Sequence, residues 1–269
     1  MRALFKKPTF LVISIFAVFA VVLFASINFY KNSQKSLPVK ISEEIKSPKY
    51  EVIGKSVQGR KIESYTYSEG KTKLLFVGGM HGGYEWNSVL LAYQFIDYLK
   101  SDLANIPKNL TISVIPSLNP DGVYEVTGKE GRFTVSDVSL DKNILTVGRF
   151  NVNKVDLNRN FDCNWQATST WQSKIVNAGK SVFSEPETQA LRDFVLKNKP
   201  DAVIFWHSQS NAVYASECNS GILPQTLLIM NTYAKASGYS AVKAFNAYKV
   251  TGDSEGWLVA DVPELQGCH

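Results

Sequence analysis

Two short apolar runs in this chain each end in a histidine. The first run, residues 74–80, leads into His81, and the second, residues 203–206, leads into His207. Runs of this length are typical of buried strands, and in an open α/β sheet the ligand-binding groups gather at strand ends. We therefore expect an α/β fold in which two strands far apart in sequence bring these histidines together, and a zinc site is the leading interpretation.

The first thirty residues predict a membrane-associated segment. No charged residue occurs from Phe10 to Phe29, and about 20 residues at roughly 1.5 Å each cross a hydrocarbon core of about 30 Å. Arg2, Lys6 and Lys7 precede this segment, so the positive-inside rule keeps the N-terminus in the cytoplasm and exports the rest. The segment is either an uncleaved membrane anchor, which we favour, or a signal removed near Ala25, after which the domain would be secreted.

The remaining chain divides into a linker and one domain. Residues 31–47 are polar, contain Pro38 and lack an apolar period, which is typical of a tether. Residues 48–269 are long enough for one large α/β domain. The net charge of +5 is modest and several of the basic residues precede residue 48, so no nucleic-acid surface is expected.

Alternating and apolar segments predict the elements of this domain. Val89, Leu90, Tyr93, Ile96 and Leu99 form one helical face. The predicted strands are residues 61–67, 73–77, 110–116 and 201–206, and a further helix covers residues 222–236. Together these predict a three-layer α/β/α domain with a mixed, mainly parallel sheet.

Two further segments carry specific expectations. Ser184 is predicted as the N-cap of a helix with Pro186 in its first turn, and Lys199 with Pro200 should end that helix. Residues 123–152 show no clean period and are predicted to form a long excursion with one hairpin.

The cysteines leave two alternatives open. Cys163 and Cys218 are compatible with a disulfide in an oxidising compartment, and unpaired thiols fit the sequence equally well. No two cysteines have the close spacing of a structural zinc site. Cys268 is therefore expected to be a buried or free thiol.

His81, Glu85 and His207 form a candidate set of zinc ligands. Catalytic zinc commonly takes two histidines and one carboxylate, and leaves one position open. Two glycines follow His81, so the backbone can turn sharply and direct His81 and Glu85 to one point. Taken singly, each histidine would more simply be a hydrogen-bonded core residue.

Arg149, Asn158 and Arg159 form a second candidate cluster. Guanidinium groups with an amide offer a planar fork for a carboxylate, and they place positive charge beside a developing oxyanion. A surface cluster of salt bridges is the competing interpretation.

The order of these motifs resembles the zinc metallocarboxypeptidases of the carboxypeptidase A type. The resemblance runs from about Tyr50 to the end of the chain. In family order the matching segments are residues 78–81 with Glu85, 119–122, 148–151, 156–161, 183–188, 207–208, and Tyr248 with 252–253 and Trp257.

The resemblance implies a role for each candidate residue. One Zn²⁺ per chain would be held by His81, Glu85 and His207. Arg149 would stabilise the oxyanion. Asn158 and Arg159 would bind the free C-terminal carboxylate of a peptide.

Two more residues take roles from the resemblance. Tyr248 would close over the bound C-terminal residue, although a plain surface tyrosine is the alternative. Glu255 would lie at the bottom of the specificity pocket, where a carboxylate favours a C-terminal Lys or Arg, because a buried acid left unpaired is costly. A solvent-facing Glu255 is the competing interpretation.

The chain departs from the family pattern at two places. Three residues separate His81 from Glu85, where the family usually has two. Family spacing also puts the general base, a glutamate, at or just past His269. Glu264 is the remaining candidate, but its segment lacks an apolar strand, and a loop carboxylate is the alternative. We therefore expect a domain truncated at its C-terminal end.

The resemblance implies a hydrolase that removes C-terminal residues, including basic ones, from peptides or proteins by means of zinc-activated water. A cell-wall peptide hydrolase of the same family is the first alternative. The second is a protein that binds zinc and peptide C-termini without turnover, because the general base has no clear place. The expected partners are peptide C-termini and, through the N-terminal helix, a membrane.

Overall fold

A computed structural model describes residues 48–208, 210–219, 221–261 and 267–268 of the chain. The predicted anchor (1–30) and linker (31–47) lie outside this part of the chain, as does Glu264. Within the described residues, none of the helices combines the length and the hydrophobicity that crossing a membrane requires.

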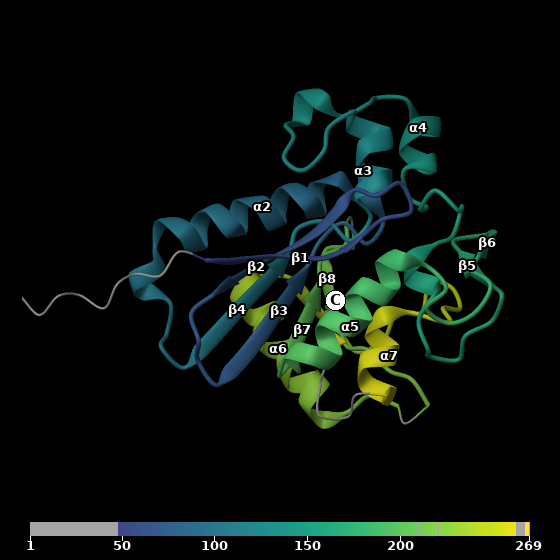
Figure 1. The fold of residues 1–269 in the computed structure, drawn as a ribbon. Coiled ribbons are helices and arrows are strands. Elements are labelled where there is room, and N and C mark those ends of the chain that lie inside the picture. The colour runs from purple at the N-terminus through teal and green to yellow at the C-terminus, as the bar shows by residue number, and fades with distance from the viewer. Residues whose placement is uncertain (1–47, 209, 220, 262–266, 269) are drawn as a thin grey trace, which may run out of the picture. The chain divides into compact units, whose positions relative to one another are not determined.

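A six-stranded mixed sheet forms the centre of the domain (Figure 1). Its strand order is β1-β2-β4-β3-β7-β10. The first two pairings in this order are antiparallel, and the other three are parallel. The strands are β1 (Lys49–Lys55), β2 (Lys61–Tyr67), β4 (Leu110–Ile115), β3 (Thr72–Val77), β7 (Ala202–Phe205) and β10 (Gly267–Cys268). The predicted mixed, mainly parallel sheet is confirmed, and the four predicted strands match β2, β3, β4 and β7.

Side chains alternate across the sheet and bury both of its faces. On β3, Leu75 and Val77 point into one core, with helix α5 (Pro186–Asn198) and helix α7 (Ser254–Asp261). Phe76, between them, packs against the opposite core. This alternation follows from the two-residue period of a strand, and it requires a layer of helices on each side.

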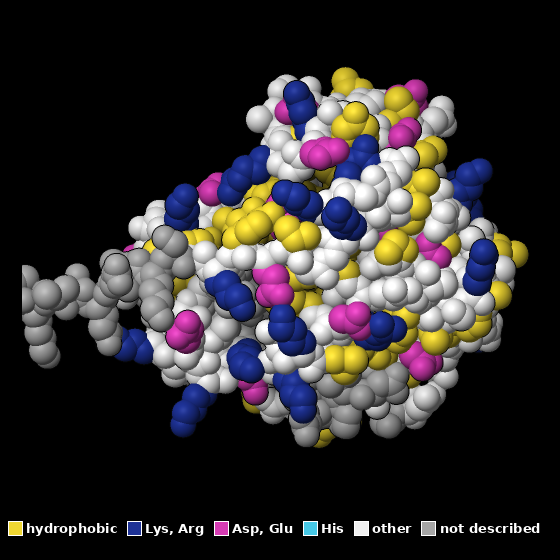
Figure 2. All heavy atoms as spheres, in the orientation of Figure 1, with side chains coloured by type: hydrophobic (Ala, Val, Ile, Leu, Met, Phe, Trp, Pro, Cys, Tyr) yellow, Lys and Arg dark blue, Asp and Glu magenta, His cyan; other side chains and the backbone are white. Residues whose placement is uncertain are grey.

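The second core is covered by helix α2 (Trp86–Ser101) and helix α6 (Pro224–Ser237). The predicted apolar face of α2 is largely confirmed, since Val89 and Tyr93 are buried with two further members and Leu90 is half-buried. On the molecular face shown in Figure 2, basic and acidic side chains are interspersed.

The hairpin predicted within residues 123–152 is wrong. The structure describes all of this segment, and it contains helix α3 (Pro120–Thr127), helix α4 (Lys142–Val147) and one short 3₁₀ turn. Asn119 caps α3 by accepting a hydrogen bond from the Gly122 backbone, and Pro120 occupies the first turn. These capping contacts favour a helix over a strand.

A hairpin does occur further along the chain. It is formed by β5 (Thr168–Trp171) and β6 (Lys174–Asn177), which pair antiparallel. A second small sheet pairs β8 (Ala212–Tyr214) with β9 (Ser240–Val242) in parallel. Both small sheets supply walls of the candidate site.

Ser184 does not cap α5, contrary to prediction. The N-cap is Glu185, whose backbone is extended, and the Ser184 hydroxyl donates to the Glu185 side chain at 2.8 Å. Pro186 begins the helix as predicted, and Lys199 ends it in a left-handed conformation with φ of +48°. The N-cap is thus one residue later than predicted, and the Ser184 hydroxyl donates to the Glu185 side chain and not to the helix N-terminus.

Candidate active site

The two histidines meet because their strands are neighbours in the sheet. His81 follows β3 and His207 follows β7, and these strands pair in parallel with Val77 opposite Phe205. Parallel neighbours end at the same edge of a sheet. The expectation that two distant apolar runs bring their histidines together is confirmed.

A glycine turn then brings Glu85 to the same point. Gly82 has φ of +47°, and a Cβ atom there would lie 2.4 Å from the carbonyl oxygen of Gly148. No other residue type fits both constraints well. The turn leads into a short 3₁₀ helix, η1 (Gly82–Glu85), which carries Glu85 back beside His81. The extra residue between His81 and Glu85 is accommodated in this turn.

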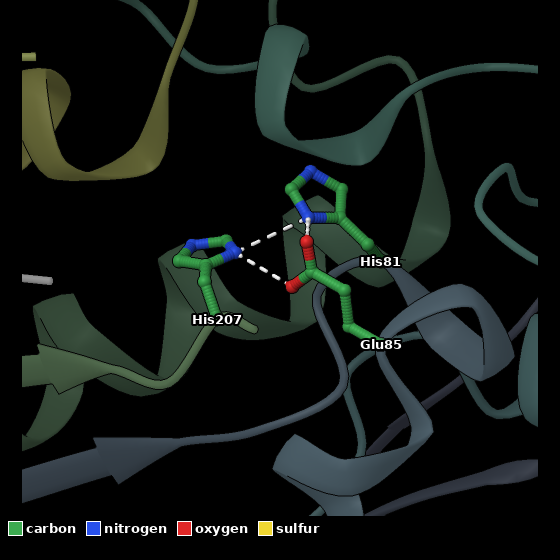
Figure 3. Close-up of side chains that lie close together, drawn as sticks. All are labelled: His81, Glu85 and His207. Atoms are coloured by element: carbon green, nitrogen blue, oxygen red, sulfur yellow. Dashed lines mark hydrogen bonds and ion pairs between the residues drawn. The ribbon is translucent and has the colours of Figure 1, made fainter. Parts of the chain in front are cut away.

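Three side chains with metal-donor atoms converge at this point (Figure 3). His81 Nδ1 lies 3.0 Å from Glu85 Oε1, and His207 Nδ1 lies 2.9 Å from Glu85 Oε2. The two Nδ1 atoms are 3.1 Å apart. Two imidazole nitrogens and one carboxylate facing each other fit a catalytic zinc ion, which neutralises the carboxylate and accepts both nitrogen lone pairs. The donor set therefore fits zinc.

The electrostatics of the donor set are strongly coupled. Burial alone would raise the pKa of Glu85, but His81 and His207 hold it well below its usual range. Burial would lower the pKa of His207, but Glu85 and Glu255 raise it to about 10. Without a metal, a proton on His207 thus balances the negative charge of the site.

Asp156 supports His81 from behind, a role that sequence reasoning did not assign. Its Oδ1 lies 3.4 Å from His81 Nε2, and its side chain is completely buried. Burial would raise the pKa of Asp156, but Arg149, then Arg159, hold it well below its usual range. A carboxylate behind a ligating histidine fixes the ring orientation. The signal was present in the sequence, since Asp156 begins the 156–161 motif.

Arg149 lies between the donor set and an aromatic wall. Its guanidinium donates to Asp156 Oδ2 from Nε at 3.0 Å and from Nη2 at 2.8 Å. Nη1 lies 3.9 Å from Glu85 Oε1. The Trp171 ring of β5 stacks on the guanidinium, with 4.4 Å between the guanidinium carbon and the ring centroid. This buried arginine is therefore no member of a surface salt-bridge cluster.

Asn158 and Arg159 lie on a single turn, η4 (Leu157–Arg159), and both are buried. Asn158 Oδ1 accepts a hydrogen bond from the backbone N–H of Ser254 at 2.9 Å, and it lies 3.0 Å from the Ser254 hydroxyl. Arg159 donates from Nε and Nη2 to the carbonyl oxygen of Thr170, at 3.2 and 3.1 Å. These contacts fix the two side chains beside the cavity.

One cavity of about 780 Å³ contains nearly all of the predicted site residues. Tyr248 lines it and packs edge to face on Phe245, with ring centroids 4.8 Å apart. The predicted residues that line it are His81, Glu85, Arg149, Asn158, Arg159, His207, Tyr248 and Glu255. Glu264 lies outside the described residues. The structure thus gathers residues that span more than half of the chain.

Glu255 is in the first turn of α7, and only 1% of its surface is exposed. The alternative of a solvent-facing Glu255 is therefore wrong. Its Oε1 lies 3.1 Å from His207 Nε2, and its Oε2 accepts a hydrogen bond from the Ser254 hydroxyl at 3.0 Å. The carboxylate is thus in contact with a histidine of the donor set.

A disulfide joins Cys163 to Cys218, with 5.9 Å between the Cα atoms. This resolves the two alternatives for these cysteines in favour of pairing. The bond connects the segment after η4 to the segment after β8, and residues 215–217 of the second segment line the cavity.

Comparison with known proteins agrees with this geometry. The family model described as zinc carboxypeptidase matches residues 41–258. The gamma-D-glutamyl-L-diamino acid endopeptidase 1 of Lysinibacillus sphaericus is 22% identical over 78% of this chain, and carboxypeptidase B of Helicoverpa zea is 28% identical over 68%. The chain spans 57% and 43% of the lengths of these two relatives.

A solved structure shows the same fold. Carboxypeptidase A of Helicoverpa armigera superposes with a TM-score of 0.60 at 23% identity, over 82% of this chain and 59% of that chain. The family match covers the β3 turn, the Arg149 segment, η4 and the β7 end, which together build the cavity. The chain therefore belongs to the zinc carboxypeptidase family.

Proposed function

We propose that this protein is a zinc-dependent metallocarboxypeptidase that removes C-terminal residues from peptides. One observation carries the proposal: the His81, Glu85 and His207 donors share a cavity with Arg149, Asn158 and Arg159. A metal beside a cluster of guanidinium and amide groups suits a substrate that has a scissile carbonyl close to a free carboxylate.

Zinc, when bound, polarises the scissile carbonyl and lowers the pKa of water. Arg149 acts on the oxygen of that carbonyl, since its Nη1 is directed toward the donor set. A fixed cation beside a developing negative charge stabilises the transition state without reorganisation. The contacts of Arg149 with Asp156 and Trp171 support this role because they hold the guanidinium in place.

Asn158 and Arg159 bind the C-terminal carboxylate of the substrate, and Tyr248 closes over the terminal residue. Their positions on the lining of the same cavity support these roles. The carboxylate of the substrate would compete with the carbonyl of Thr170 for the Arg159 guanidinium. A charged acceptor is the stronger partner in such a competition.

A preference for basic C-terminal residues is part of the proposal. Asp253 and Glu255 both line the cavity and supply negative charge. Burial and then the charge of Glu255 raise the pKa of Asp253 to about 6, which indicates that the two acids lie in one electrostatic environment. A substrate Lys or Arg side chain would relieve this accumulation of negative charge.

Glu264 is the proposed general base, and it lies outside the described residues. If it does not act in this way, the site binds zinc and peptide C-termini without turnover, which is the alternative from a different class. Zinc content and turnover separate these two functions, because a binding protein has the first without the second.

Cleavage of cell-wall peptides is the other enzymatic candidate. It is favoured by the similarity to the gamma-D-glutamyl-L-diamino acid endopeptidase, which extends over 78% of this chain.

We also propose that residues 1–30 direct the domain to the extracytoplasmic side, as a membrane anchor or a cleaved signal. The disulfide supports this location, because disulfides persist in oxidising compartments.

The test uses the purified full chain loaded with zinc. Release of C-terminal Lys and of C-terminal Phe is measured on matched short peptides, together with cleavage of a γ-D-glutamyl-diamino acid peptide. Faster release of Lys supports the basic carboxypeptidase, and cleavage of the γ-D-glutamyl bond alone supports the cell-wall enzyme. Stoichiometric zinc with no cleavage of any of the peptides would exclude hydrolysis and leave the binding function.

A further inference from the structure

His207 has a buried carboxylate partner on the side of its ring that faces away from the zinc donors. Its Nδ1 faces Glu85 at 2.9 Å, and its Nε2 lies 3.1 Å from Glu255 Oε1. When Nδ1 binds a metal, the ring proton must reside on Nε2. In that state His207 donates a hydrogen bond to Glu255.

We propose that Glu255 is a positioning residue for the zinc site, which holds His207 in the metal-binding tautomer and orientation. A carboxylate that accepts the remote N–H of a ligating histidine fixes the ring and raises its basicity. This role rests on the zinc site and does not depend on which peptide is the substrate.

The contacts of the second oxygen support the proposal. Glu255 Oε2 lies 3.0 Å from the hydroxyl of Ser254, and the same hydroxyl is 3.0 Å from Asn158 Oδ1. The hydroxyl has only one proton, but Asn158 also accepts the backbone N–H of Ser254 at 2.9 Å. The hydroxyl proton is thus available to Glu255, which fixes the carboxylate from the far side.

Each of the two histidines of the site thus has a carboxylate beside the ring nitrogen that faces away from the metal position. Asp156 stands behind His81 at 3.4 Å, and Glu255 stands behind His207 at 3.1 Å. Both carboxylates are almost fully buried. A buried carboxylate needs a hydrogen-bonding partner, which is His207 for Glu255 and Arg149 for Asp156.

The geometry also excludes Glu255 as the general base in this arrangement. Nδ1 and Nε2 point away from each other across the imidazole ring, so a group bonded to Nε2 lies on the opposite side of His207 from the metal position. A general base must reach the water that it deprotonates. Glu255 therefore acts through His207.

Glu255→Gln and Glu255→Met test this role in the full chain. Gln keeps the size and an acceptor but loses the charge, whereas Met loses both. We expect zinc affinity, measured by competition with a chelator, to fall about tenfold for Gln and toward a hundredfold for Met. Glu217→Gln is the matched control, because Glu217 lines the same cavity but is exposed. Its zinc affinity should equal that of the parent.

Two additional readouts separate positioning from a purely structural role. The absorption spectrum of the Co²⁺ form of the Gln variant should shift. The unfolding midpoint of its metal-free form should fall, because Gln removes the charged partner of His207, so the zinc affinities of both proteins are compared well below that midpoint. Should Met prevent folding, the Gln variant alone decides. If the zinc affinity of Glu255→Gln stays within twofold of that of the parent, the positioning role is overturned. This holds even if the variant has a changed preference for C-terminal Lys over Phe. A parent that binds no zinc would instead refute the zinc site itself.

Discussion

Asp156 accepts two hydrogen bonds from Arg149, from Nε at 3.0 Å and from Nη2 at 2.8 Å, and both side chains are almost completely removed from water. Burying two charges is costly, and it is tolerated here because each compensates the other. Asp156 also lies behind the His81 ligand and Arg149 lines the cavity, so the pair connects the stability of the domain to the chemistry of its site.

Replacing Arg149 with Met should therefore damage stability and activity together. Removing one partner of a buried ion pair leaves an uncompensated charge and costs about 3–5 kcal/mol. Loss of a preorganised cation at the oxyanion should lower kcat by about 100-fold or more. Urea unfolding and steady-state kinetics measure the two effects. Arg132→Met is the control, because Arg132 forms an exposed bidentate pair with Asp97 that should contribute about 0–1 kcal/mol. Equal losses of stability in the two variants would contradict the burial argument.

Glu85→Gln should abolish stoichiometric zinc binding. The carboxylate supplies the charge between the two Nδ1 atoms, and an amide supplies a weaker, neutral ligand. Zinc affinity should fall more than about 100-fold, a larger loss than for a residue behind the ligands. Elemental analysis after dialysis measures the zinc content. Glu125→Gln, at an exposed position on α3, should keep one zinc per chain. Full zinc occupancy in Glu85→Gln would remove Glu85 from the ligand set.

Zinc binding should strengthen as the pH rises. The metal-free protein holds the pKa of His207 at about 10, so zinc must displace a proton from this ring at neutral pH. The pKa of Glu85 is lowered, so that carboxylate is already ionised and adds no pH dependence. Affinity should then rise roughly tenfold per pH unit between about pH 6 and 9. Titrations in buffers of different ionisation enthalpy measure the released proton directly. A pH-independent affinity would show that His207 is neutral before zinc binds.

Removing the disulfide should destabilise the domain without removing the zinc. Cys163 and Cys218 are 55 residues apart, and closing a loop of that length stabilises the folded state by roughly 4 kcal/mol in the chain-entropy description. Urea unfolding of the Cys163→Ala/Cys218→Ala variant measures this loss. Zinc stoichiometry is the internal control, because the ligands are held by β3, η1 and β7. A variant as stable as the parent would show that the bridge adds no constraint.

The sheet and the zinc donors could be predicted from the sequence because their signals are local. The runs that end at His81 and His207 are short, apolar and bounded, and such segments form buried strands. The hairpin error within residues 123–152 arose because the capping contacts of Asn119 outweighed a weak period. Ser184 failed as a cap because its hydroxyl bonds the neighbouring Glu185 side chain instead, a choice that no sequence pattern records.

The supporting contacts of the site could not be predicted in this way. Asp156 meets His81, and Glu255 meets His207, across separations of 75 and 48 residues. Such contacts depend on which helix ends lie beside which strand ends, and periodicity carries no information about that. The sequence therefore predicted the ligands but not the contacts of Asp156 and Glu255 with the two ligand histidines.

The pairing of β3 with β7 has a consequence for how the domain acquires its metal. Val77 lies opposite Phe205, and a shift of one residue in this register would turn the side chains of one strand to the other face. The donors are separated by more than 120 residues of chain, so they meet only after both strands have found their places. Zinc therefore binds the correctly aligned fold and not its precursors. Because it binds only the folded state, zinc shifts the unfolding equilibrium toward that state. Metal occupancy in a preparation thus reports the fraction of chains whose central sheet has formed in register.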